Sequence, residues 1–306
     1  MTTEVANRVE VAVCQLCGSR ERSVAFTEPP WQVVRCSGCG LVYVTPRLSG
    51  EALREVYGES YWRSDTPKTR GYADYARDAD LYLKTFRRRF RLVRQHVGDR
   101  PLRVLDVGCA AGFFLRVCRE LGHDAYGVEI SPAIAALAVD ALGADRVFVG
   151  DLDAAVAERG ATYALHSFDL VTMWDVVEHV PDPQALLRTA RGLLKPDGRL
   201  VLETQNVASR FARLLGPRWQ HYKHDEHLYH FDPDTARMLL DQAGFDLVAW
   251  TPRFGGKYVS FAFIAERAAR LGRFAAFCLR PLGWLRGANV YLNFRDEMIL
   301  IARPRA

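Results

Sequence analysis

The alternation of short apolar runs with amphipathic stretches from Leu102 onward constrains the fold of this chain more than any other feature. Apolar runs that predict strands lie at 102–107, 124–129, 146–149, 168–173, 199–204, 245–250 and 296–302. Amphipathic stretches that predict helices lie near 112–121, 133–141, 183–194 and 233–243. A helix that crosses between two strands makes them parallel. We therefore expect an α/β fold with a doubly wound (Rossmann-like), mostly parallel seven-stranded sheet and an antiparallel last strand.

Four of the seven cysteines lie within the first 40 residues, as two Cys-x-x-Cys-Gly pairs. The pairs are Cys14 with Cys17 and Cys36 with Cys39. Four soft thiolates at this spacing suit one tetrahedral Zn²⁺ and leave no open position for chemistry, so we expect a structural zinc ion in a small zinc ribbon or knuckle module. The alternatives are four unrelated buried cysteines, or a redox pair, which lacks the usual βαβ surroundings here.

Composition and motifs divide the chain into a zinc-binding module, a linker with a helical lid, and the α/β domain with two insertions. The expected ranges are 1–45, 46–100 and 101–306, with the insertions at 205–232 and 255–290. Residues 78–97 predict a strongly basic helix within the second part. Its basic residues indicate a solvated helix face, and the alternative is a phosphate-binding surface.

The charge and the apolar pattern narrow the location and the partners of the protein. A formal net charge of +5 is too small to demand a nucleic-acid partner. The first residues lack the basic and apolar regions of a signal peptide, and no uncharged apolar stretch reaches the roughly 18 residues of a membrane span. With an odd number of cysteines, these features favour the reducing cytoplasm.

The predicted strand ends carry a glycine-rich turn and three acidic residues. The first strand ends in Asp106-Val107-Gly108, and Gly112 follows, so the turn is GxxxG and lacks the GxGxxG pattern of a dinucleotide site. Backbone can approach a ligand closely at such glycines. Glu129, at the end of the second strand, can accept hydrogen bonds from both ribose hydroxyls of a nucleoside. Asp151, after the third strand, can accept one from an adenine amino group.

With these motifs in order from about 102 to 250, the chain resembles the class I S-adenosylmethionine-dependent methyltransferases. The resemblance extends to Leu193-Leu194-Lys195-Pro196-Asp197-Gly198, the usual turn into the fifth strand. One departure is that family members often have a third glycine where this chain has Ala110 or Ala111. The resemblance implies S-adenosylmethionine as cosubstrate and S-adenosylhomocysteine as product, bound by Tyr72, Asp106, Gly108, Cys109, Gly112, Glu129, Ile130, Asp151, Leu152 and Trp174.

Four of the eight histidines fall within residues 221–230, after the fifth strand, where acceptor-binding residues enter this fold. The stretch, together with the four-cysteine module, also resembles zinc-binding sugar methyltransferases of antibiotic pathways. That resemblance implies His227 as general base, oriented by Glu226, with His179 nearby. A neutral imidazole suits this role near pH 7. The alternatives are local hydrogen bonding in a loop, a metal site, and a structural role for His179.

Relatives that methylate a sugar carbon carry a further C-terminal domain, whereas this chain ends at Ala306. We therefore expect methylation of a hydroxyl on a sugar, a glycolipid or another secondary metabolite; the alternative is sugar C-methylation. The alternatives from other classes of protein are a nucleotide oxidoreductase, and a zinc-containing nucleic-acid-binding protein or RNA methyltransferase. The basic helix at 84–94 gives the last its best support.

Residues 255–306 carry nine basic and three acidic residues among large apolar ones. We expect two amphipathic helices near 255–290 that cap the acceptor cleft or form a dimer contact. The alternative is a peripheral contact with the inner face of the membrane, because a basic amphipathic stretch with Phe and Trp can lie in a lipid interface.

Overall fold

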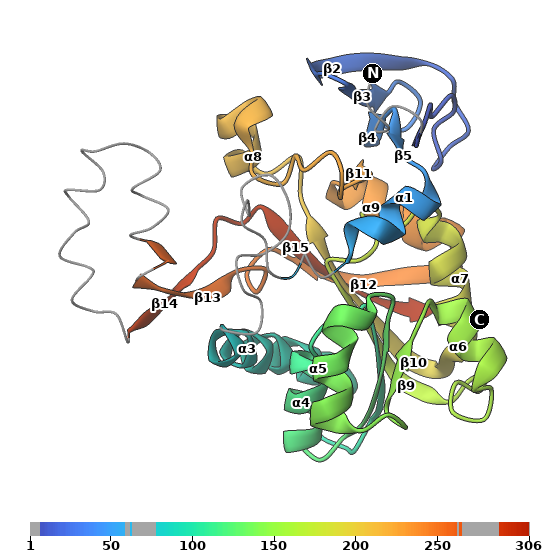
Figure 1. Cartoon of the computed structure of the whole chain (residues 1–306), viewed down its shortest axis with the longest axis vertical. Helices are drawn as coiled ribbons and strands as arrows, with labels where there is room; N and C mark the ends of the chain where they lie inside the picture. The colour runs from blue at the N-terminus through green and yellow to red at the C-terminus, as the bar shows by residue number, and fades with distance from the viewer. Residues whose placement is uncertain (1–6, 59–61, 63–77, 262, 265–287, 306) are drawn as a thin grey trace.

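The computed structural model describes residues 7–58, 62, 78–261, 263–264 and 288–305 (Figure 1). Tyr72 and most of the 255–290 insertion lie outside the described residues. The central sheet has seven strands in the order β12-β15-β10-β9-β6-β7-β8. Their bounds are β6 (Arg103–Val107), β7 (Asp124–Glu129), β8 (Val147–Val149), β9 (Phe168–Trp174), β10 (Leu194–Gln205), β12 (Phe245–Thr251) and β15 (Glu297–Pro304).

Strand direction follows the prediction. The pairs within β10-β9-β6-β7-β8 are all parallel, and β15 runs antiparallel to both of its neighbours, β10 and β12. The predicted doubly wound sheet with an antiparallel last strand is therefore confirmed. The order reverses between β6 and β9, which is where ligands bind in open α/β sheets.

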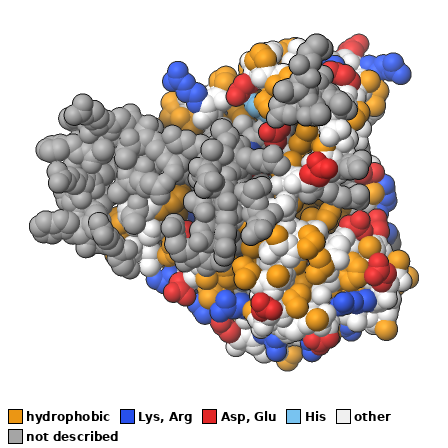
Figure 2. All heavy atoms as spheres, in the orientation of Figure 1, with side chains coloured by type: hydrophobic (Ala, Val, Ile, Leu, Met, Phe, Trp, Pro, Cys, Tyr) orange, Lys and Arg blue, Asp and Glu red, His pale blue; other side chains and the backbone are white. Residues whose placement is uncertain are grey.

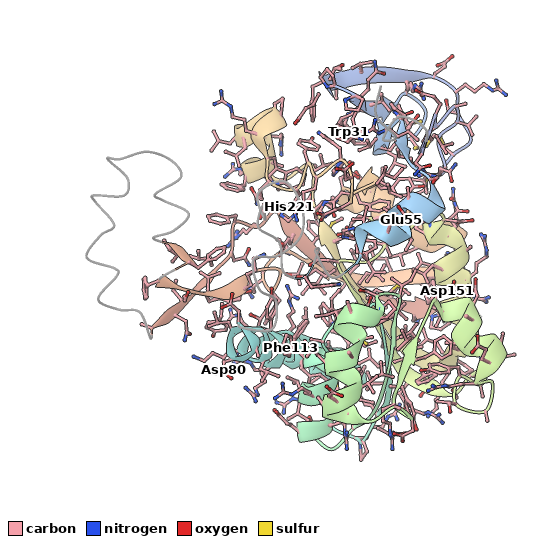
Figure 3. The ribbon with its side chains drawn as sticks, viewed as in Figure 1. Trp31, Glu55, Asp80, Phe113, Asp151 and His221 are labelled. Atoms are coloured by element: carbon pink, nitrogen blue, oxygen red, sulfur yellow. The ribbon has the colours of Figure 1, made fainter. Side chains whose placement is uncertain are left out.

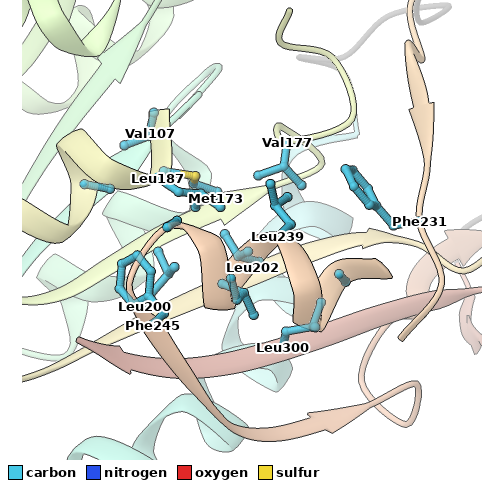
Figure 4. Packing of buried hydrophobic residues seen from close by; sticks show 14 of the residues in the cluster. Val107, Met173, Val177, Leu187, Leu200, Leu202, Phe231, Leu239, Phe245 and Leu300 are labelled. Atoms are coloured by element: carbon cyan, nitrogen blue, oxygen red, sulfur yellow. The ribbon is translucent and has the colours of Figure 1, made fainter. Parts of the chain in front are cut away.

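Helices cover both faces of the sheet (Figure 1). One face packs on α3 (Ala79–Val97), α4 (Phe113–Glu120) and α5 (Pro132–Leu142), the other on α6 (Leu152–Glu158), α7 (Pro183–Leu193) and α9 (Pro233–Gln242). Alternation along the strands supplies both cores: on β6, Leu105 and Val107 join the second face and Val104 the first. Figure 4 shows Leu187 of α7 and Leu239 of α9 in the second core.

Local sequence signals set the helix boundaries. Asp232 caps α9 by accepting from the backbone N–H of Thr235, whose hydroxyl accepts in return from the Asp232 N–H, and Pro233 occupies the first helical position. The predicted helices and strands lie within a few residues of those observed. The seven-residue α6 was not predicted. Strand β10 begins earlier than expected, at Leu194, and its register against β9 shifts between Leu194 and Arg199.

The N-terminal module is a four-stranded antiparallel sheet in the order β11-β4-β3-β2. Three strands are close in sequence, and the fourth comes from the 205–232 insertion. Their bounds are β2 (Arg22–Glu28), β3 (Trp31–Cys36), β4 (Val42–Thr45) and β11 (Tyr229–His230). A second ladder joins β1 (Arg8–Val9) to β5 (Arg47–Leu48), and α1 (Gly50–Val56) follows directly. The sequence did not reveal that a distant segment completes this sheet.

The remaining described elements are short. They are α8 (Arg210–Leu215), the 3₁₀ turn Gly216–Arg218, and the antiparallel pair β13 (Lys257–Ser260) and β14 (Asn289–Leu292). The expected helices near 255–290 are therefore wrong at both ends of this insertion, where β13 and β14 form an antiparallel strand pair. Among the described residues, no helix has the length and apolar character needed to cross a membrane. On the face drawn in Figure 2, acidic and basic side chains are interspersed over the lower part of the molecule.

Candidate active site and metal centre

A cavity of about 360 Å³ lies at the carboxyl ends of β6, β7 and β9, at the point where strand order reverses. We call the part lined by residues 106–131 the donor half. The part lined by Asp175, His179, Lys257 and Glu297 is the histidine half. A volume of this size is within the usual range for a small-ligand site.

The glycine-rich turn forms the floor of the donor half. Gly108 has φ 74°, and a Cβ at this position would lie 2.6 Å from Cγ2 of Val176. Ala110, where the family often has glycine, also takes a left-handed φ of 47°. The turn therefore keeps a left-handed backbone conformation at position 110, although the third glycine is absent. Gly112 packs on Ala138 and Leu142 and does not line the cavity.

Glu129 is held in place by its own backbone neighbours. One carboxylate oxygen accepts from the Ala110 N–H at 2.9 Å and the other from the Ser131 N–H at 2.8 Å. Burial raises the pKa of this carboxyl, and the backbone N–H groups oppose that shift. Each carboxylate oxygen has a second lone pair, so this fixed group can still accept from two ribose hydroxyls.

Asp106 has a different environment from Glu129. Burial raises its pKa to about 8, which favours the neutral carboxyl at pH 7. The hydroxyl of Thr172 donates to its Oδ1 at 2.6 Å. A protonated carboxyl on the cavity wall can donate as well as accept, so this residue offers the ligand a donor that its residue type does not suggest.

Most of the predicted cofactor residues line the cavity: Asp106, Gly108, Cys109, Glu129, Ile130, Asp151 and Trp174. The Asp151 carboxylate caps α6 by accepting from the Ala154 N–H at 2.9 Å. Leu152 is buried behind it, outside the lining. Figure 3 shows Asp151 at the start of α6 and His221 beneath the module that carries Trp31.

Several lining residues were not predicted from the sequence. The indole of Trp62 donates to the Ser131 hydroxyl at 2.9 Å, next to Glu129. Arg89 lies on the basic helix α3, and its Nη2 is 2.5 Å from Oε1 of Glu203. Both side chains are almost fully buried. The helix periodicity assigned this arginine to a solvated face, whereas it pairs with a carboxylate from β10. Further lining residues that were not predicted include Tyr57, Tyr82, Thr85, Phe86, Lys257 and Glu297.

His179 is the candidate base that lines the cavity. Its Nδ1 lies 3.0 Å from the carbonyl oxygen of Glu226 and 2.9 Å from the Tyr57 hydroxyl. A carbonyl only accepts, so Nδ1 carries the proton and Nε2 is the basic nitrogen. Burial lowers the pKa of His179, so the ring is neutral near pH 7.

His227 lies behind His179, with ring centroids 4.6 Å apart, and is not part of the lining. Its Nδ1 donates to the His221 carbonyl at 2.8 Å, and burial lowers its pKa well below the usual value. The Glu226 carboxylate accepts from Lys223 at 3.2 Å. Glu178, His179 and His227 also offer three ligand atoms within 4.8 Å of one another, a spacing that a metal ion could bridge.

The four predicted zinc ligands converge in the N-terminal module. The sulfurs of Cys14 and Cys39 are 3.6 Å apart, and those of Cys17 and Cys36 are 3.5 Å apart. A tetrahedral ion about 2.3 Å from each sulfur would separate neighbouring sulfurs by about 3.8 Å. All four lie within 4.8 Å of one another, so the cluster fits one such ion.

A parallel sheet with a reversal of strand order, a GxxxG turn and a fixed acidic residue at the end of the next strand are the arrangement expected of an S-adenosylmethionine-dependent methyltransferase. Residues 75–249, more than half of the chain, match the family described as a methyltransferase domain. The chain belongs to this family.

Among curated proteins, the chain is similar to the ubiquinone biosynthesis O-methyltransferases of Xanthomonas oryzae pv. oryzae and Xanthomonas axonopodis pv. citri. It is 35% and 36% identical to them over 132 residues, which cover 40% of this chain and 55% of each relative. The chain thus spans about half the length of the curated relatives it matches.

Solved structures are similar at lower identity. A protein from Pyrococcus horikoshii OT3 has a TM-score of 0.49 at 15% identity, covering 80% of this chain and 99% of its own. A SAM dependent methyltransferase from Archaeoglobus fulgidus has a TM-score of 0.47 at 19% identity, covering 75% and 98%.

Proposed function

We propose that the protein transfers the methyl group of S-adenosylmethionine to a hydroxyl of a sugar, a glycolipid or another secondary metabolite. The observation that carries the proposal is the His179 imidazole, which lines the same cavity as the donor half and whose pKa is lowered by burial. The curated relatives are named as O-methyltransferases, which agrees with a hydroxyl acceptor. A carbon acceptor, in sugar C-methylation, is the alternative.

The donor half would hold the nucleoside of the cosubstrate. Glu129 would accept from the ribose hydroxyls, and the Gly108 turn would admit the methionine part close to the backbone. The protonated carboxyl of Asp106 would donate to the ligand. The bound cosubstrate supplies an electrophilic methyl group, and the main contribution of the chain is to align the acceptor oxygen with it.

We assign proton removal to Nε2 of His179. As the acceptor oxygen bonds to the methyl group and S-adenosylhomocysteine leaves, the hydroxyl proton passes to this nitrogen, while Nδ1 keeps its own proton and donates it in a hydrogen bond to the Glu226 carbonyl. His227, predicted from the sequence as the base, would support the ring of His179 from behind. Its role as the base itself stays a prediction.

We also propose that Cys14, Cys17, Cys36 and Cys39 hold one structural zinc ion. The sulfur spacing and the four soft donors support this assignment. With four ligands from the chain, such an ion would have no free position for an acceptor, so it would stabilise the module and take no direct part in methyl transfer.

A methyl-uptake screen tests the proposed function. The chain would be incubated with S-adenosylmethionine carrying a labelled methyl group and with nucleotide sugars, glycolipids, polyprenyl phenols and total RNA. Label on a hydroxyl oxygen of a small acceptor is the expected result. Label on carbon would favour the C-methylating alternative, and label on RNA alone would favour the RNA methyltransferase.

We propose a cytoplasmic enzyme whose acceptor is a small molecule, with no nucleic-acid partner. A peripheral membrane contact through 255–290 stays a prediction, because most of that segment lies outside the described residues.

A further inference from the structure

The N-terminal module is joined by backbone hydrogen bonds to the segment that carries the clustered histidines. We call residues 219–231 the histidine loop. Its strand β11 is the edge strand of the module's sheet, where Tyr229 pairs with Tyr43 and His230 with Val42. The Val44 N–H also donates to the Leu228 carbonyl at 3.1 Å. The loop therefore takes its backbone conformation from the module.

Side chains add a second set of contacts between the module and the loop. Glu28 of β2 lies 3.2 Å from Nε2 of His224, which is almost fully buried. The ring of Phe26 meets Tyr222 edge to face, with centroids 4.8 Å apart.

A third contact ties the module to the cavity wall itself. Arg47 of β5 donates to the Tyr229 hydroxyl at 2.8 Å, and that hydroxyl donates to the carbonyl of Pro181 at 2.8 Å. Pro181 lines the cavity two residues after His179. The backbone on this side of His179 is thus linked to β5 through one tyrosine.

Both partners of the His179 Nδ1 come from segments that the module holds. Glu226, whose carbonyl accepts from Nδ1, belongs to the histidine loop. Tyr57, whose hydroxyl lies 2.9 Å from the same nitrogen, follows α1, which begins two residues after β5. Leu53 of α1 belongs to the apolar cluster that includes Cys14 and Cys36 and extends into the core of the α/β domain.

We infer that the four-cysteine module is a positioning device for His179, acting through Tyr57 and through the histidine loop. The Glu226 carbonyl can only accept, so it sets the tautomer with the proton on Nδ1, and the Tyr57 hydroxyl, as a second acceptor of that proton, helps to fix the plane of the imidazole, so that Nε2 is presented to the cavity. Tyr57 is therefore a positioning residue. The inference rests on the proposed function only in treating His179 as the base.

The Tyr57 hydroxyl does not reach Glu129, the main carboxylate of the donor half, although the Tyr57 backbone carbonyl accepts from the Ser131 hydroxyl at 2.5 Å, a contact that loss of the Tyr57 hydroxyl would keep. Glu129 is fixed by the N–H groups of Ala110 and Ser131, which lie within the α/β domain. Loss of the Tyr57 hydroxyl would therefore release the imidazole while the Glu129 contacts stay in place. This separates a positioning role from a general loss of structure.

The first test compares Tyr57→Phe with Tyr163→Phe. The second variant is a matched control, because Tyr163 donates a buried hydrogen bond to the Gly127 carbonyl at 3.0 Å, away from His179. With the acceptor found by the methyl-uptake screen, we expect Tyr57→Phe to lower kcat about 10-fold, with the KM for S-adenosylmethionine unchanged. The control should keep its kcat. Equal kcat in Tyr57→Phe and wild type, or equal losses in the two variants, would overturn the inference.

The second test needs no acceptor, so it fails or succeeds independently of the proposed function. Amide hydrogen exchange of the full chain would be followed before and after removal of its bound metal with a zinc chelator. We expect faster exchange at residues 226–230, with α4 and α5 unchanged and S-adenosylhomocysteine still bound. Metal loss with unchanged exchange at 226–230 would show that the module does not hold the loop, as would uniform acceleration over the whole chain.

Discussion

The two halves of the cavity are built in opposite ways. The donor half comes from one continuous stretch, residues 106–131, in which Glu129 is fixed by the N–H groups of Ala110 and Ser131. The histidine half is assembled from distant segments: His179 follows β9, and its two Nδ1 partners come from Tyr57 and Glu226. The half that we propose for the cosubstrate is thus mostly local, and the half that we propose for the acceptor depends on tertiary contacts.

This difference makes the two halves separable by mutation. A change in the N-terminal module or at His179 should alter turnover and leave cosubstrate affinity intact, whereas a change at Glu129 should weaken cosubstrate binding directly. The predictions below test that separation, in order of the free energy they involve.

The largest effect is expected at the four-cysteine cluster. Metal analysis of the purified protein should find one zinc ion per chain. Cys36→Ser should lose it and destabilise the module strongly, because binding free energy at such a site is folding free energy. Thermal unfolding followed with and without S-adenosylhomocysteine measures both effects. If Cys36→Ser weakens the binding of S-adenosylhomocysteine as strongly as it lowers the stability, the two halves are not separable.

The next effect is expected at His179. His179→Ala should lower turnover about 10²–10⁴-fold, the range for loss of a general base, and His227→Ala should cost less because His227 lies behind the lining. Steady-state kinetics of the two variants decides between them. If His227→Ala is the more damaging change, the sequence-based assignment of the base is the right one.

The pH dependence of wild-type turnover adds a check on the same residue. Burial lowers the pKa of His179, so turnover should rise with pH through a pKa below the usual histidine value and then stay level. The acid limb should shift or vanish in His179→Ala. A limb that is identical in the variant would belong to another group.

A smaller effect is expected at Asp106, because burial raises the pKa of its carboxyl from the ordinary 3.8 to about 8. Between about pH 4 and 8 the folded state keeps a proton that the unfolded chain has released, so this residue lowers stability as pH rises. Asp106→Asn cannot ionise and keeps an oxygen for Thr172. Chemical unfolding should show the variant gaining on wild type between pH 5 and 8, on the order of 1–3 kcal/mol. A constant difference across that range would mean that Asp106 is ionised in the fold.

Periodicity predicted the sheet because each strand of the core alternates between two apolar faces, as Ile299 and Leu300 do on β15. The donor half was predictable because its turn and its acid lie in one run of sequence. Strand β11 could not be predicted, because it has only two residues and pairs with Val42 and Tyr43, which are far away in the sequence. The contact of Tyr57 with His179 and the buried Arg89–Glu203 pair could not be predicted either, because side-chain contacts between distant segments leave no periodic pattern in the sequence.

Calorimetric titration with S-adenosylhomocysteine tests the central claim most directly, using wild type, Glu129→Ala and His179→Ala. The claim is that the donor half binds the cosubstrate independently of the histidine half. Wild type and His179→Ala should bind alike, and Glu129→Ala should bind roughly 10-fold or more weakly, because the ribose hydroxyls lose a charged acceptor. Equal affinity in Glu129→Ala and wild type, or a comparable loss in His179→Ala, would contradict it.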